Sequence, residues 1–197
     1  MSATYDPAND LKEAVAMANA LVPYIHESEL YGSTGGGFFS RMPRLTVGGL
    51  LMRLRRLDAL RDTLNDSQQA ELQAAIDRNE EVFRTWRNHY EGKLEREATS
   101  RLNAMNAFFD ECASNPRSCS GNYSPEASRR TIVQELIIAM KERKMDPSNI
   151  EKLARAADSR LQSYTRPADF IWDEQLRSVY PRADFWWLYQ KPPTANK

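Results

Sequence analysis

Arginines gather between residues 41 and 61, where acidic residues hardly oppose them. The stretch has a local charge of +5, with one acid, Asp58, against six arginines: Arg41, Arg44, Arg53, Arg55, Arg56 and Arg61. On a helical wheel Arg61 falls inside an apolar arc of leucines. A buried arginine needs a carboxylate or a bound anion, because an unpaired buried charge costs several kcal/mol. The pattern favours a salt bridge to an acid of the following long helix. The alternative is a small anionic ligand bound by Arg53, Arg56 and Arg61.

A glycine-rich segment precedes this cluster. It runs from Gly32 to Gly37 and is followed by Phe38 and Phe39. Glycines would let backbone amides approach an anion, but the segment lacks the Gly-Lys-Ser/Thr ending of a phosphate loop, and no β-strand is predicted before it. We interpret it as a flexible connector that presents Phe38 and Phe39, and in the anion-binding alternative as a lid.

Histidine and cysteine patterns do not predict a metal centre or a catalytic site. His26 has Glu29 three residues on, whereas His89 has no carboxylate three or four positions away. Di-iron bundles need repeated Glu-x-x-His motifs, which do not occur in the sequence. Neither Ser nor Cys stands in a recognisable nucleophile motif. We therefore expect no metal and no cofactor, and the sequence leans away from an enzyme.

The C-terminal segment contains an internal echo. Ala168-Asp169-Phe170-Ile171-Trp172 recurs as Ala183-Asp184-Phe185-Trp186-Trp187, fifteen residues later. Two short helices with aromatic anchors would pin the tail onto the rest of the fold, and this structural interpretation is favoured. The functional alternative is a partner-binding anchor, because Trp and Tyr dominate interface hot spots. Its residues would be Phe185, Trp186, Trp187 and Tyr189.

The elements that position these residues are predicted to be helices. The sequence has 22 Ala and 18 Leu but only 6 Val and 7 Ile, a bias toward helix over strand. Apolar residues recur at helical spacing through most of the chain. The fold class is therefore predicted to be all-α, a helical bundle of five to six main helices with one very long helix and an aromatic C-terminal wrap. The expected division is a bundle over 1–165 and a proline-punctuated aromatic segment over 166–197.

The very long helix is predicted from a stripe at helical spacing between Leu72 and Cys112, which is apolar except for Asn79 at one step. Its period is about 3.6 residues, which matches a straight α-helix. A helix of about 45 residues would be roughly 68 Å long. Only Gly92 threatens its continuity, and we expect the helix to bend there without breaking.

Charge and hydropathy constrain the partners and the compartment. Lys plus Arg and Asp plus Glu balance at 27 each, which argues against nucleic acid as a partner. No uncharged apolar run reaches about 18 residues, so no membrane span is expected. No leader is visible, and cytoplasmic localisation is the expectation. In that compartment Cys112 and Cys119 are expected to be free thiols, the alternative being a short disulfide loop in an oxidising one.

These observations predict a non-catalytic helical interaction or scaffold protein. It would bind a protein partner or self-associate as a homo-oligomer, through the long helix or the aromatic tail. The alternative function is a helical-bundle pocket for a small anionic ligand, with the arginine cluster as its charge partner.

Overall fold

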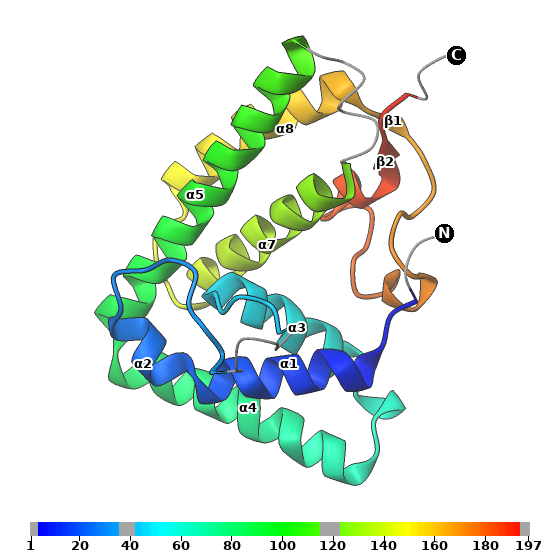
Figure 1. Cartoon of the computed structure of the whole chain (residues 1–197). Helices are drawn as coiled ribbons and strands as arrows, with labels where there is room; N and C mark the ends of the chain where they lie inside the picture. Colours follow the sequence, from blue (N-terminus) through cyan, green and yellow to red (C-terminus); the bar gives the residue numbers. More distant parts are fainter. Residues whose placement is uncertain (1–3, 36–41, 115–122, 194–197) are drawn as a thin grey trace. The chain divides into compact units, whose positions relative to one another are not determined.

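The computed structural model describes residues 4–35, 42–114 and 123–193. It confirms the all-α class: the described residues form seven α-helices, three short 3₁₀ segments and one pair of two-residue strands (Figure 1). None of these helices is both long and apolar enough to cross a bilayer. Contacts divide the chain into two compact units. The N-terminal unit is Asp6–Glu97, and the C-terminal unit is Met1–Tyr5 with Ala98–Lys197. The expected division at residue 165 stays a prediction.

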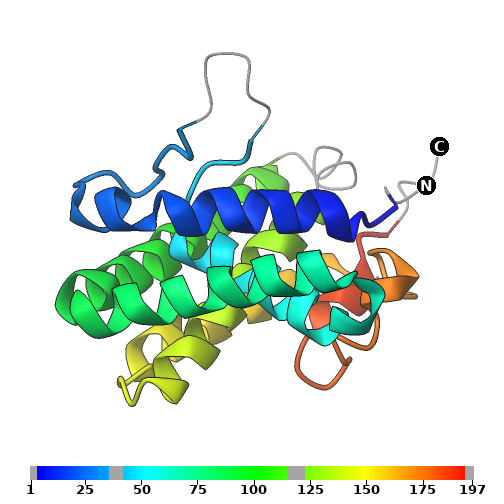
Figure 2. The ribbon, with the colours of Figure 1, turned by 90° about the horizontal axis from the view of Figure 1, so that it is seen from below.

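The N-terminal unit is built from α1 (Pro7–Asn19), α2 (Leu21–His26), α3 (Val47–Ala59), η1 (Arg61–Thr63), α4 (Asp66–Thr85) and the first part of α5 (Arg87–Ser114). Asp6 caps α1 by accepting from two backbone amides, and a proline follows it at the first helical position. α1 packs against both α3 and α4, and its course alongside α4 is visible in Figures 1 and 2. The apolar stripes of these three helices form the core of this unit.

The prediction of a long helix is confirmed by α5, which has 28 residues. Its predicted continuity from Leu72 to Cys112 is wrong, because α4 ends at Thr85 and α5 begins at Arg87. Trp86 between them leaves the helical conformation, with φ −123° and ψ 41°. The buried Tyr90 hydroxyl donates to the Asn79 side chain at 2.8 Å, eleven residues back. Eleven residues of straight helix span about 16 Å, more than these two side chains can bridge, so this hydrogen bond requires the break. Continuity at Gly92 is confirmed, since this glycine lies within α5.

The C-terminal unit contains the rest of α5, α7 (Tyr123–Glu142), α8 (Ser148–Tyr164), β1 (Arg166–Pro167), η2 (Glu174–Leu176), η3 (Trp186–Tyr189) and β2 (Gln190–Lys191). α7 is covered on several sides, since its buried residues lie on more than one face. The tail closes on itself where β1 pairs antiparallel with β2, with Arg166 opposite Lys191. The tail also packs on α7 through η3, which confirms the aromatic C-terminal wrap.

Cys112 is disulfide-bonded, so the expectation of a free thiol at this position is wrong. The side chain of Cys112 is fully buried near the end of α5. Cys119 lies outside the described residues. Disulfides persist mainly in oxidising compartments, and the cytoplasmic localisation expected from the sequence stays a prediction.

Candidate functional site

The three arginines predicted to bind a ligand have different surroundings. Arg53, on α3, pairs with Asp10 and Glu13 of α1, at 3.3 Å and 2.5 Å. Its side chain is only 12% exposed, compared with 32% for that of Arg61. Arg56 lies with its guanidinium 3.3 Å from the sulfur of Met52, one turn earlier on α3.

Arg61 does not lie in the apolar arc where the helical wheel places it. α3 ends at Ala59, and Arg61 begins a 3₁₀ turn that rotates its side chain outward. It pairs with Asp58 at 2.7 Å and donates to Gln73 of α4. The expected salt bridge to an acid of the following helix is therefore wrong. Arg53 and Arg61 direct their guanidinium groups at different helices, so the three arginines do not converge on one ligand.

Three of the four aromatics predicted to bind a partner are buried within the C-terminal unit. Phe185, Trp187 and Tyr189 are 3%, 1% and 6% exposed, whereas Trp186 is half-buried. The Trp187 indole donates to the Thr131 hydroxyl at 2.9 Å.

Two residues of α7 also hold Trp187. The Tyr123 hydroxyl donates to the Trp187 carbonyl at 2.6 Å, and burial raises the pKa of that phenol. The guanidinium carbon of Arg130 lies 3.9 Å from the ring centroid of Trp187, while Arg130 forms a two-point hydrogen bond with Asp158 of α8. These contacts favour the structural interpretation of the tail.

The loop between α2 and α3 is anchored at its start by cations of α5. The Lys93 ammonium donates to the Glu29 carbonyl at 2.5 Å, and Arg96 donates to the Ser28 carbonyl at 2.6 Å. The Lys93 ammonium also lies 3.8 Å from the ring centroid of Tyr24. Lys93 is 2% exposed, and this burial lowers its pKa. A buried ammonium is costly unless it is compensated, so the contacts with Glu29 and Tyr24 hold the loop against α5.

The same loop is closed further along by its own backbone. Gly32 and Leu45 form an isolated antiparallel bridge, in which the Gly32 N–H donates to the Leu45 carbonyl at 2.9 Å and the Leu45 N–H donates to the Gly32 carbonyl at 3.0 Å. The Tyr24 hydroxyl donates to the Leu30 carbonyl at 2.8 Å. At the end of the loop the fully buried Glu97 carboxylate accepts from the Gly48 N–H at 2.8 Å, in the first turn of α3. A carboxylate at a helix N-terminus is stabilised by the helix dipole.

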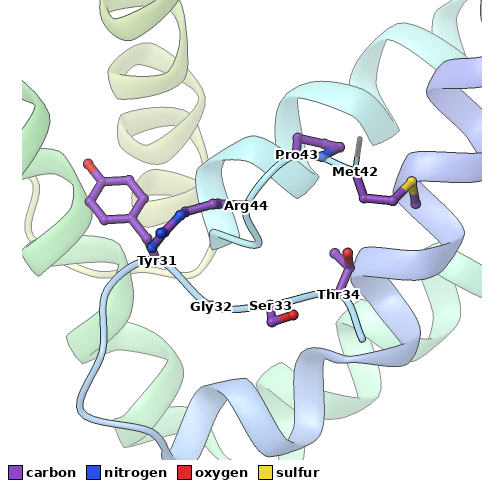
Figure 3. Close-up of a pocket in the computed structure, with 7 residues that line it drawn as sticks. All are labelled: Tyr31, Gly32, Ser33, Thr34, Met42, Pro43 and Arg44. Carbon is purple, nitrogen blue, oxygen red and sulfur yellow. The ribbon is translucent and has the colours of Figure 1, made fainter. Parts of the chain in front are cut away.

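A pocket of about 280 Å³ lies at this closed loop. It is lined by Tyr31, Gly32, Ser33, Thr34, Met42, Pro43 and Arg44 (Figure 3). Arg44 is the only charged side chain among these seven. It is exposed and has no ion-pair partner within the described part of the chain. Arg41 and residues 36–39 of the predicted glycine loop lie outside the described residues.

An exposed cluster joins one face of α2 to the break between α4 and α5. We call it the α2 surface, and its residues are Val22, His26, Trp86 and His89. Val22 and Trp86 are 37% and 39% exposed. The ring centroid of His26 lies 4.4 Å from that of Trp86 and 4.9 Å from that of His89. Val22 and His26 are four residues apart, on one face of α2. The helix break therefore turns Trp86 out of the apolar stripe and against this face.

Sequence reasoning missed both the anchoring residues and the α2 surface. Asn79, a polar residue inside an apolar stripe, was the only signal of the break. Lys93 and Glu97 flank stripe positions on α5, but their partners are 49 to 64 residues away in the chain. His26 and His89 are 63 residues apart, so no local spacing relates them.

Comparison with protein-family models, with curated proteins and with solved structures finds no match to this chain. The function is therefore inferred from the residues and geometry of the chain itself.

Proposed function

We propose that this chain is a non-catalytic helical interaction protein that self-associates through the α2 surface. The observation that carries the proposal is the 39% exposure of Trp86 at the break between α4 and α5. When it is fully covered, an aromatic side chain of this size buries roughly 150–250 Å² of its surface. Because Trp86 is 39% exposed, part of that area stays uncovered in the monomer, and a second copy can cover it.

The charge of the chain supports a second copy as the partner. Acidic and basic residues balance, giving a formal net charge of +0 at pH 7. Two such chains have no long-range repulsion to overcome, and a net charge near zero promotes association. Trp is also the residue type most enriched in interface hot spots. The α2 surface thus replaces the tail aromatics as the proposed contact.

Sedimentation velocity over a concentration series tests this proposal. We expect the wild-type chain to shift from monomer to dimer as its concentration rises, and Trp86→Ser to remain monomeric. Tyr31→Ser is the matched control, because Tyr31 is also 39% exposed but lies outside the α2 surface. Circular dichroism verifies that each variant is folded. A wild-type chain that stays monomeric throughout, or a Trp86→Ser variant that still dimerises, contradicts the proposal.

A second candidate function, binding of a small anion, is supported by Arg44. Its guanidinium is the one charge among the described residues that line the loop pocket, and the Ser33 and Thr34 hydroxyls could add hydrogen bonds. Arg44 thus takes the place of Arg53, Arg56 and Arg61 in this alternative. Isothermal titration with inorganic phosphate and with citrate tests it. We expect binding by the wild-type chain and its loss in Arg44→Met. Equal heats for the two proteins would contradict anion binding at this pocket.

A further inference from the structure

The only two histidines of the chain lie side by side. His26 ends α2 and His89 lies in the first turn of α5, yet their ring centroids are 4.9 Å apart. Both side chains are exposed. Neither imidazole forms a hydrogen bond or an ion pair with any residue that the structure describes. Their ring nitrogens are therefore available to a ligand from solution.

We propose that His26 and His89 form a two-imidazole site for a divalent transition metal, such as Cu²⁺ or Zn²⁺. Neutral imidazole is a preferred ligand of these ions, whereas Mg²⁺ requires oxygen ligands. This inference does not depend on self-association, although the two residues belong to the α2 surface.

The separation of the two rings fits chelation of one ion. A metal–nitrogen bond of about 2.05 Å, with the nitrogen about 1.1 Å from its ring centroid, places the metal about 3.2 Å from each centroid. Two centroids 4.9 Å apart then subtend about 100° at the metal, which lies between square-planar and tetrahedral angles. The rings are inclined at 61°, and the terminal torsion of His is broad enough to turn each nitrogen toward the ion.

The site leaves coordination positions open. Among the described residues no three His, Cys, Asp or Glu side chains gather in a way that could hold a metal. Water or a ligand from solution therefore completes the coordination sphere. Trp86 lies 4.4 Å from His26 and 6.4 Å from His89, centroid to centroid, so its fluorescence reports on a bound Cu²⁺ ion.

Isothermal titration of the full chain, produced without a histidine tag, tests the site with Cu²⁺, Zn²⁺ and Mg²⁺. We expect Cu²⁺ to bind more tightly than Zn²⁺, and Mg²⁺ not to bind. His26→Phe and His89→Phe keep an aromatic ring at each position and remove only the nitrogens. Each should weaken binding by at least about tenfold, because even indirect metal contacts contribute this much. Unchanged Cu²⁺ affinity in either variant would overturn the proposal.

Proton NMR provides a readout that distinguishes a chelate from adventitious binding to one imidazole. The chain has two histidines and therefore two sets of imidazole signals, which the single variants assign. We expect Zn²⁺ to shift both sets along one binding curve. A shift of one set alone would refute the two-imidazole site. Trp86→Phe should keep the affinity for Cu²⁺ but lose fluorescence quenching; retained quenching would place the ion elsewhere.

Discussion

Gly32 packs so closely against Tyr24 that even a methyl group at this position should destabilise the fold. An ideal Cβ built on Gly32 would lie 2.4 Å from the Cδ2 atom of the Tyr24 ring. The ring has little room to retreat. Its hydroxyl is bonded to the Leu30 carbonyl, and the Lys93 ammonium lies 3.8 Å from its centroid. Gly32→Ala therefore forces a shift of the loop, the ring or both.

Gly32→Ala overpacks a buried site, and we expect it to lower the free energy of unfolding by about 1–3 kcal/mol. Gly92→Ala is the matched control with the opposite sign. Gly92 lies inside α5, and an added Cβ there would meet no heavy atom within 4 Å. Where no clash results, replacing a helical glycine with alanine raises the free energy of unfolding by roughly 0.5–1 kcal/mol.

Urea unfolding followed by circular dichroism measures both changes in one assay. We expect the midpoint to fall for Gly32→Ala and to rise for Gly92→Ala, with little change in the slope of either transition. An unchanged or raised midpoint for Gly32→Ala would show that the contacts with Leu30 and Lys93 do not hold the Tyr24 ring in place. A lowered midpoint for Gly92→Ala would refute the description of α5 as an unobstructed helix at this position.

Five further variants test other parts of the fold, and the same urea assay measures the stability of each. Burial raises the pKa of the Glu126 carboxyl, so the folded state binds a proton more readily than the unfolded state and loses stability as the pH rises through the folded pKa. Glu126→Gln should therefore raise stability at neutral pH and flatten its fall between acidic and neutral pH; a lowered midpoint would contradict this. Cys112→Ser removes a disulfide and should lower the free energy of unfolding by about 2–4 kcal/mol. If reduction leaves the intact mass of the wild-type chain unchanged, no such bond forms. Deleting 182–197 removes several buried aromatic and leucine side chains worth about 1.5–3 kcal/mol each, so the shortened chain should unfold or aggregate, and a stable one would contradict the wrap. Arg53→Ala should lower the free energy of unfolding more than Arg61→Ala does. The first change leaves Asp10 and Glu13 without their arginine, which is 12% exposed, whereas Arg61 is 32% exposed. Equal losses for the two variants would contradict this ranking.

Local patterns in the sequence were enough to predict the class of fold and most helices. Helical spacing depends on residues three and four apart, so the segment from Leu72 onward shows its apolar stripe without any tertiary information. The uninterrupted helix at Gly92 follows from the same short-range rules, and the structure confirms it. The aromatic wrap was likewise predictable, because Trp and Phe side chains in a segment rarely remain in water when a face can cover them.

Tertiary contacts decided the rest, because they join residues that no local spacing relates. The break at Trp86 is coupled to a hydrogen bond between Asn79 and Tyr90. A helical wheel assumes one straight helix, so it cannot show where the helix breaks. Because α3 ends at Ala59, Arg61 does not lie in the apolar arc that the helical wheel predicts. Arg53 pairs with acids of α1 because α1 packs against α3. The sequence alone determined which residues prefer helix and which face each helix buries. Where those helices end, and which distant side chains then meet, depended on long-range contacts, whose energies appear only when the chain is folded.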